Sequence, residues 1–476
     1  MLRRLIGVVA CLLLALAAVP ASAQVTVQFW HAMGGELGDK TNGVAEGFNA
    51  SQTQYKVVPV FKGTYPEVMT GAIAAFRAKQ HPHIVQVFEV GTATMMAAKG
   101  AIYPVYKLMQ DAGEPFDPKT YVASVVGYYT DADGNLLSMP FNSSTPVMYY
   151  NKTAFQKAGL DPSRPPATWD ELEEAAKKLL AAGYKCGFTT GWPSWVQIEN
   201  FSALHNVPLG TRANGFAGLD AVLTIATPLH VTHLSKLGEW QKSKVFDYGG
   251  RRSDSAPKFY NQECAMYMNS SAAQAGVQAN AKGFEWGVAM LPYWKAVGAA
   301  PQNSIIGGAT LWVLAGHKSD EYKGIAKFFT YMSKPEVQAK WHQETGYLPI
   351  TGAAYELSKQ QGFYEKNPGT DVSIKQMNLK PPTENSKGLR FGNFVQIRDV
   401  IEDEMEAVFA GTKTAQAALD EAVARGNELL RKFEPGEAVR QINANNPQLL
   451  ELADEIAALS VQAGGSVRQN AITAQL

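Results

Sequence analysis

Residues 139–155 read MPFNSSTPVMYYNKTAF and place a polar cluster between two apolar segments. The cluster stands directly before Pro146 and consists of Asn142, Ser143, Ser144 and Thr145. A strand that enters a core normally holds apolar residues at alternate positions, so this cluster indicates backbone that either crosses open space or faces a ligand. The apolar run from Val147 to Tyr150 is typical of a strand, and we expect it to open a second lobe.

Upstream of this stretch, strand-like and helix-like segments alternate. The strand-like segments are 25–30, 55–61 and 84–88. A segment with helical spacing follows each of them, and the one after the third strand is 92–100. Such alternation favours an α/β lobe with a parallel sheet covered by helices on both faces. Ligands of these lobes bind beyond the carboxyl ends of the strands, beside helix N-termini, which is where Tyr65 and Glu89 are expected.

Downstream, the pattern of a second lobe follows. Thr168 and Glu171 form a predicted capping box at the start of a helix, and residues 303–316, NSIIGGATLWVLAG, repeat the apolar style of a sheet core. From Gln396 the chain is mostly helical, and residues 435–476 form a polar tail with one more predicted helix near 449–459. Because domains usually hold about 100–200 residues, this length predicts two large lobes.

The first 23 residues have the form of a secretory signal peptide. Arg3 and Arg4 precede an apolar run that ends near Ala21-Ser22-Ala23, which predicts cleavage after residue 23 and a periplasmic location. Cys11 lies inside the apolar run, so lipidation is disfavoured, and no second run of about 18 apolar residues argues for a membrane span. The processed chain would carry 41 basic and 43 acidic residues. This near-neutral balance provides no long-range field for nucleic acid or an anionic membrane.

Signals for catalysis and metal binding are weak. The sequence contains no Walker loop, zinc-protease helix motif, nucleophile elbow or GxGxxG motif. His81 and His83 flank Pro82 without a third ligand nearby in the sequence, which favours a solvated loop over a metal site. We therefore expect no enzyme activity, no metal and no cofactor.

The two cysteines of the processed chain, Cys186 and Cys264, lie in strand-like segments of the same predicted lobe. One bridge is possible in an oxidising compartment, and two buried thiols are the alternative. The residues alone leave this choice open.

Several long segments, read in order, carry a resemblance to a known family. They are FWHAMGGELGD (29–39), VFKGTYPEVM (60–69), VFEVGTATMMAAKGAI (87–102), PFNSSTPVMYYNK (140–152), CGFTTGWPSW (186–195), IIGGATLWV (305–313), WHQETGYLPIT (341–351), GFYEKNPGTD (362–371) and KGLRFGNFVQIR (387–398). From about residue 25 to 434 the chain resembles the periplasmic sn-glycerol-3-phosphate-binding proteins of bacterial ABC importers, which are maltose-binding-protein-like. The tail, 435–476, lies outside the resemblance, and its role is not predicted.

The resemblance implies a two-lobed periplasmic binding protein of type II. Each lobe would hold a mainly parallel sheet covered by helices, and the ligand would lie in the cleft between the lobes. The implied first lobe covers residues 24–140 and about 302–348, and the second covers about 146–300 and 350–434. The quoted stretch would then be one of the crossings between the lobes.

The same resemblance implies the ligand contacts. They fall on Tyr65, Glu89, Ser144, Trp192, Ser270, Gly307, Tyr347 and Arg398. We add Trp195, because it offers a second flat face three residues after Trp192. An Arg fork matches phosphate oxygens, so Arg398 is assigned to the phosphate, with the two serines, the Tyr347 hydroxyl and the Gly307 N–H completing the shell. Glu89, a pure acceptor, is assigned to two glycerol hydroxyls.

Alternatives stay open for several of these residues. Without the resemblance, Arg398 reads as an i,i+4 partner of Glu402, and Arg390 competes for the phosphate. The two tryptophans, taken alone, would more often pack over a lobe surface, and Tyr65 would be a surface residue at a helix start. Ser143 and Ser271 are neighbours of the predicted serines that the sequence does not exclude.

The predicted function is delivery of glycerol 3-phosphate, or a glycerophosphodiester such as glycerophosphocholine, to an ABC permease and its ATPase by a periplasmic monomer. A sugar-binding protein of the same fold is the alternative within the class. A secreted phosphodiesterase is the alternative from another class, and it lacks the metal cluster or activated nucleophile that hydrolysis requires.

Overall fold

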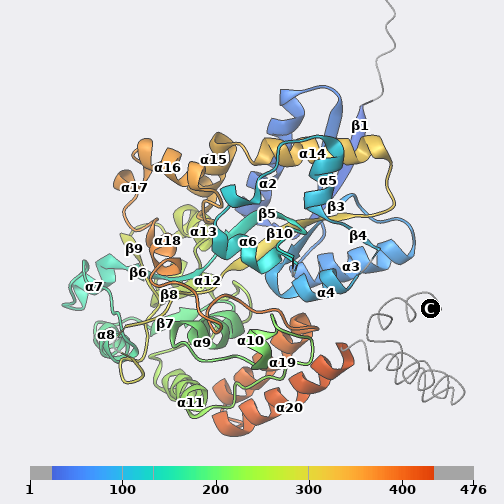
Figure 1. Cartoon of the computed structure of the whole chain (residues 1–476). Helices are drawn as coiled ribbons and strands as arrows, with labels where there is room; N and C mark the ends of the chain where they lie inside the picture. Colours follow the sequence, from blue (N-terminus) through green and yellow to red (C-terminus); the bar gives the residue numbers. More distant parts are fainter. Residues whose placement is uncertain (1–23, 99, 132, 299, 434–476) are drawn as a thin grey trace, which may run out of the picture.

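The computed structural model describes residues 24–98, 100–131, 133–298 and 300–433, which fold into two lobes with a sheet in each (Figure 1). The predicted signal peptide and tail lie outside the described residues. Among the described helices, none is long and apolar enough to cross a membrane.

The first lobe is built on a six-stranded sheet with the order β2-β1-β3-β10-β4, and β5 also pairs with β10. Its strands are β1 (Val25–His31), β2 (Tyr55–Phe61), β3 (Ile84–Phe88), β4 (Ile102–Tyr103), β5 (Met139–Ser144) and β10 (Gly307–Leu314). β1 runs parallel to β2 and β3, whereas β10 runs antiparallel to β3, β4 and β5. The buried faces of β1 and β10 supply apolar core residues such as Val27, Phe29 and Leu311.

The second lobe is built on a four-stranded sheet with the order β7-β8-β6-β9. Its strands are β6 (Pro146–Asn151), β7 (Cys186–Thr190), β8 (Cys264–Ser270) and β9 (Trp286–Ala289). β7 and β8 are parallel, and their register places Cys186 opposite Cys264. The two cysteines form a disulfide across these strands, with the Cα atoms 4.6 Å apart. Of the two alternatives that the sequence left open, the structure therefore has the bridge and not two buried thiols.

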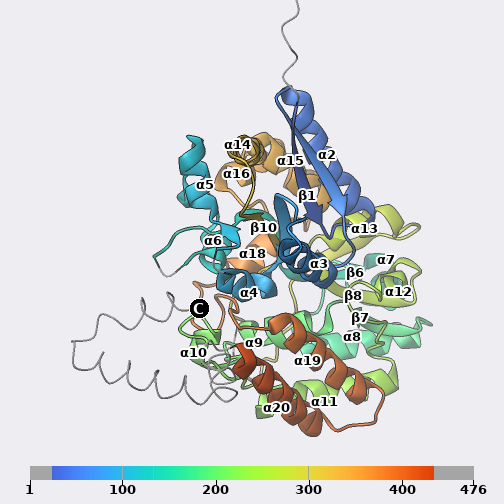
Figure 2. The same ribbon diagram turned by 90° about the vertical axis from the view of Figure 1, so that its right-hand side faces the viewer.

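Helices cover both sheets, and Figures 1 and 2 show the two groups at opposite ends of the molecule. The helices of the first lobe include α2 (Gly35–Ser51), α3 (Tyr65–Arg77), α4 (Thr92–Ala97), α5 (Val105–Ala112), α6 (Ala123–Tyr129), α14 (Ser319–Met332) and α15 (Pro335–Thr345). Those of the second lobe include α8 (Trp169–Ala181), α11 (Pro228–Ser243), α12 (Ala256–Tyr260), α19 (Phe394–Phe409) and α20 (Ala415–Phe433). α13 (Ala273–Asn280) follows β8 and also contacts α2 and α15, so it lies where the lobes meet. The capping box predicted at Thr168 is present at the start of α8.

The quoted stretch is a crossing between the lobes. β5 ends at Ser144 in the first sheet, and β6 begins at Pro146 in the second, so only Thr145 lies between them. Thr145 is buried, and its hydroxyl donates to the Ile305 carbonyl at 3.0 Å, on the segment that leads into β10. Thr145 of the polar cluster therefore hydrogen-bonds buried backbone at the junction of the two sheets.

The prediction of a two-lobed α/β fold is confirmed, but each sheet is mixed and not mainly parallel. The difference arises at the crossings, because β10 enters the first sheet against β3, and β6 enters the second sheet against β8 and β9. The residue boundaries predicted for the two lobes stay a prediction.

Candidate functional site

A cavity of about 190 Å³ lies between the lobes, and it gathers eight of the nine predicted contact residues. The first lobe contributes the ends of β3 and β5 and the starts of β10 and α2, and the second contributes the end of β8, the start of α13 and part of α19. The predicted residues in its lining are Tyr65, Glu89, Ser144, Trp192, Trp195, Ser270, Tyr347 and Arg398. Gly307 is not in the lining, whereas its neighbour Gly308 is.

Strand register explains why distant residues meet here. At the edge of the first sheet, Ser144 pairs with Gly307, and at the edge of the second sheet Pro146 pairs with Ser270. The single-residue crossing at Thr145 therefore brings Ser144 and Ser270 to the same junction.

Arg398, on the first turns of α19, lies between two carboxylates. Its Nε and Nη2 donate to Glu199 at 2.8 and 2.6 Å, and Nη2 also donates to Glu89 at 2.7 Å. Glu199 belongs to the second lobe, as Arg398 does, whereas Glu89 follows β3 in the first lobe, so this pair links the two sides of the cleft. We call Glu89, Glu199 and Arg398 the inner cluster.

Burial and charge act against each other in the inner cluster. Burial raises the pKa of Glu89, and Arg398 opposes this rise. Burial lowers the pKa of Arg398, but Glu199 and Glu89 outweigh it and hold the pKa above its ordinary value. The guanidinium is therefore cationic, and the cluster carries one positive charge and up to two negative charges.

The two arginines that compete for the phosphate in the sequence differ in position. Arg398 hydrogen-bonds Glu89 and Glu199 and does not form the i,i+4 bond with Glu402. Arg390 lies outside the cavity, where its Nη2 donates to the carbonyls of Gly127 and Tyr128 at 3.2 and 2.7 Å.

Tyrosines form the wall of the first lobe. The Tyr65 ring stacks on Phe88 with 5.1 Å between centroids, and its hydroxyl accepts a bond from Asn142 at 2.9 Å. Burial raises the pKa of Tyr347 to about 12, and its ring is parallel to that of Trp341. Both hydroxyls are therefore neutral donors over the physiological pH range.

Two helices begin at the cavity without a side-chain cap. α2 starts after Gly34, and α13 starts after Ala272, and both of these residues line the cavity. First-turn N–H groups and the helix dipole favour an anion at such ends. The buried hydroxyls of Ser143, on β5, and of Ser271, two residues before α13, have no partner among the described residues.

Trp195 lies against Gly307, which explains the glycine. A Cβ atom at residue 307 would come within 2.4 Å of the Trp195 ring. Trp195 begins a π-helical segment, Trp195–Asn200, and its buried Nε1 has no partner among the described residues. Trp192 adopts a positive φ of 47° and its N–H donates to the Arg252 carbonyl at 2.7 Å.

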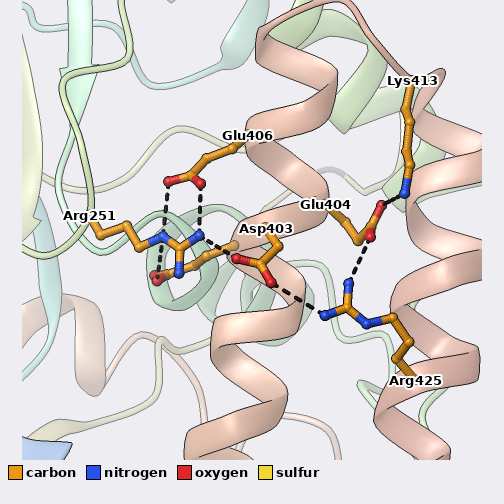
Figure 3. Close-up of polar contacts among 7 residues, drawn as sticks. Arg251, Asp403, Glu404, Glu406, Lys413 and Arg425 are labelled. Carbon is orange, nitrogen blue, oxygen red and sulfur yellow. Dashed lines mark hydrogen bonds and ion pairs between the residues drawn. The ribbon is translucent and has the colours of Figure 1, made fainter.

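A second set of charges lies farther along α19, as Figure 3 shows. We call it the outer network, and it consists of Arg251, Asp403, Glu404, Glu406, Lys413 and Arg425. Arg251 holds Glu406 through Nε and Nη2 at 2.9 and 2.7 Å. Because Ser253, two residues on, lines the cavity, the outer network anchors that loop to the helix that carries Arg398.

The structure provides neighbours for His83 that the sequence spacing did not indicate. His317 and Glu321 lie beside it, with His83 Nε2 3.7 Å from the Glu321 carboxylate. However, His83 Nδ1 accepts a bond from the Gln28 N–H at 3.0 Å, so in the neutral ring Nε2 keeps its proton. A metal at Nε2 would have to displace that proton and break the Gln28 bond, which makes this group a poor metal site.

Sequence reasoning missed several residues of the cavity and its support. Asn269, Ser253, Met33 and Gly308 line the cavity, and Glu199 stands behind Arg398. Glu199 carried a signal, since it is a carboxylate directly after Ile198 in a stretch where Trp195 and Val196 are also apolar. Such a carboxylate is buried only with a partner.

Known proteins resemble the chain over most of its length. The family model of the bacterial extracellular solute-binding proteins matches residues 43–370. The sn-glycerol-3-phosphate-binding periplasmic protein UgpB of Yersinia pseudotuberculosis is 55% identical over 415 residues, which cover 87% of this chain and 94% of the relative. The UgpB protein of Pectobacterium atrosepticum is 53% identical over 426 residues, covering 89% and 96%.

Solved structures share the fold. UgpB of Mycobacterium tuberculosis in complex with glycerophosphocholine has a TM-score of 0.71 at 22% identity, covering 88% of this chain and all of that one. The GacH receptor of Streptomyces glaucescens has a TM-score of 0.71 at 20% identity, covering 87% of this chain and all of that one. By sequence and by architecture, the chain belongs to the bacterial extracellular solute-binding proteins.

Proposed function

We propose that the chain is the periplasmic solute-binding protein of an ABC importer and binds sn-glycerol 3-phosphate in the cleft between its lobes. The observation that carries the proposal is the composition of the cavity, which joins a charged pair, neutral hydroxyls and uncapped helix ends. The high identity to proteins named for this ligand supports the same substrate. The protein acts by binding and not by catalysis, as a monomer that delivers its ligand to the permease and its ATPase.

Two groups of lining residues favour different parts of the ligand. At the inner cluster, Glu89 can accept from glycerol hydroxyls, while Arg398 has Nη1 left to donate to a hydroxyl oxygen. Two carboxylates already hold the other nitrogens of this arginine, so a phosphate dianion placed there would meet negative charge.

Other lining residues offer neutral donors. They are the hydroxyls of Ser144, Ser270 and Tyr347 and the first N–H groups of α13. We therefore assign the phosphate to these donors, whereas the sequence predicts it at Arg398. The resemblance had also assigned Gly307 a phosphate contact, and we give Gly307 the role of seating Trp195.

The aromatic residues serve the carbon chain. Trp192 and Trp195 supply apolar faces from the second lobe, and Tyr65 faces them from the first. A phosphodiester keeps unesterified oxygens that can accept hydrogen bonds from the first N–H groups of α13, so a diester such as glycerophosphocholine is a second candidate ligand. A sugar would use the same aromatic faces, and the ring of neutral donors at α13 favours the phosphate ester over it.

Calorimetry with purified, ligand-stripped protein tests the function. We expect one molecule of glycerol 3-phosphate to bind per chain and maltose to produce no heat of binding. A titration with glycerophosphocholine ranks the diester against the monoester. Saturable binding of maltose without binding of either phosphate ester would overturn the proposal in favour of the sugar alternative.

A further inference from the structure

Glu199 is a buried carboxylate that lies behind the cavity and not in its lining. Its side chain is 0% exposed, and it accepts two bonds from Arg398, through Nε to Oε1 and through Nη2 to Oε2. Oε1 also accepts from the Ser194 hydroxyl at 2.9 Å. Both oxygens are therefore committed, and one whole edge of the guanidinium is occupied.

This pair lies within one lobe. Glu199 is on the π-helical segment and Arg398 on α19, so opening of the cleft leaves their bond intact, whereas the Glu89 bond to Arg398 joins the two lobes. A bidentate pair of this kind fixes the plane of the guanidinium before a ligand arrives. The guanidinium nitrogen without a bond to either glutamate is Nη1, and Arg398 itself lines the cavity.

The backbone that carries Glu199 is itself unusual. Residues Trp195–Asn200 form a π-helix, a rare conformation that occurs often at functional sites. Asn200, the next residue, accepts from the Ile305 N–H at 2.9 Å and donates to the Trp195 carbonyl at 3.1 Å. The same turn thus supports Trp195 in the cavity, Glu199 on the arginine and the segment that leads into β10.

We infer that Glu199 is a positioning residue that determines specificity, because it cancels the charge of Arg398 and presents only Nη1 to the cleft. The inference rests on the proposed function. With Glu199 in place, Arg398 accepts a neutral hydroxylated group as its ligand, and a free anion gains little there. Without the Glu199 charge, Glu89 alone faces Arg398, so the inner cluster no longer has excess negative charge that repels an anion, and the cleft loses the preference that orients glycerol 3-phosphate.

The test variant is Glu199→Gln, which keeps the shape and removes the charge. Glu402→Gln is the matched control, because Glu402 is a buried acid four residues after Arg398 on the same helix and forms its ion pair with Arg251. Wild type and both variants are titrated with glycerol 3-phosphate and with inorganic phosphate, and their thermal melts are recorded.

For Glu199→Gln we expect affinity for inorganic phosphate to rise about tenfold and affinity for glycerol 3-phosphate to fall about tenfold, whereas Glu402→Gln changes each by less than about threefold. A merely structural role would weaken both ligands together, in step with the melting temperature. Parallel loss of both affinities, or an unchanged ratio between them, would overturn the inference.

Glu199→Asp separates charge from position and serves where Glu199→Gln does not fold. The shorter carboxylate keeps its charge but withdraws from the guanidinium, so we expect weaker binding of glycerol 3-phosphate without any gain for inorganic phosphate. A gain of phosphate affinity in this variant would also contradict the inference. If wild type fails to bind glycerol 3-phosphate, the proposed function fails, and the inorganic phosphate titrations still decide the role of Glu199.

Discussion

Helix α19 contributes to two groups of charged residues whose cations differ in burial. In the inner cluster the Arg398 side chain is 6% exposed, whereas in the outer network those of Arg251, Lys413 and Arg425 are 28%, 39% and 40% exposed. The ion pair of Arg251 with Asp403 is as short as those of Arg398 with its two glutamates, at 2.6–2.7 Å. The contrast shows that geometry alone does not measure importance, because removing one partner of a buried pair leaves an uncompensated charge, while water replaces a lost partner at the surface.

The largest expected effect comes from Arg398→Ala. Truncation removes the donor to the ligand and leaves Glu89 and Glu199 buried without their cation, so binding of glycerol 3-phosphate should weaken by ~3–5 kcal/mol, about two to three and a half decades in Kd. Calorimetry measures this directly. Arg390→Ala is the control, since Arg390 bonds two carbonyls outside the cavity, and tight binding that survives the Arg398 change would remove the inner cluster from the site.

Loss of the disulfide should affect stability and not binding. Replacing Cys186 and Cys264 by alanine removes a covalent link between β7 and β8 and should lower the free energy of unfolding by about 2–4 kcal/mol. Denaturant unfolding measures the loss, and calorimetry should return a nearly unchanged Kd. Two reactive thiols in denatured, unreduced wild-type protein would show that the bridge is absent.

The pH dependence of stability tests Glu402, which interacts with Arg398 of the inner cluster and with Arg251 of the outer network. Glu402 lies next to Arg251, and burial raises the pKa of its carboxyl to about 7 against the pull of Arg398 and Arg251. Because the folded protein then holds this proton to higher pH than the unfolded chain does, stability should decline as pH rises from about 4.5 to 7, by about 1–3 kcal/mol for this group.

The matched variant for this prediction is Glu402→Gln. It should flatten that part of the pH profile, which thermal melts at closely spaced pH values record. Identical slopes in wild type and variant would mean that Glu402 ionises normally.

The smallest effect is expected in the outer network. Lys413→Ala removes one partner of Glu404, but Arg425 still donates to that carboxylate at 3.0 Å, and Lys413 is 39% exposed. We expect a loss below ~1 kcal/mol in unfolding free energy and no change in ligand affinity. A loss as large as that of the disulfide variant would mean that the outer network is energetically coupled to the core.

The polar cluster around Thr145 left two interpretations open, backbone that crosses open space or backbone that faces a ligand, and the family resemblance predicted the crossing. The sequence also predicted the lobe count and the helix start at Thr168, since these depend on local patterns. Strand direction was predicted less well, because whether β10 runs parallel or antiparallel to β3 depends on where the chain re-enters the sheet and not on its own residues.

For the candidate site, residue types alone were insufficient. In the sequence, Arg398 fits an i,i+4 pair with Glu402 as well as it fits a ligand contact. Only the packing of the π-helical segment against α19 brings Glu199 to the Arg398 guanidinium. The start of α13 carries no charged residue, so its backbone N–H groups left no trace in the sequence pattern. These are contacts between segments far apart in the chain, which local patterns do not encode.

The most direct test of the account is a crystal structure of the protein with glycerol 3-phosphate bound. We predict the glycerol hydroxyls on Glu89 and Arg398, and the phosphate oxygens within about 3 Å of the first N–H groups of α13 and the hydroxyls of Ser144 and Ser270. The bonds between Glu199 and Arg398 should persist in the complex. A phosphate held by the Arg398 guanidinium, with Glu199 displaced, would contradict the account.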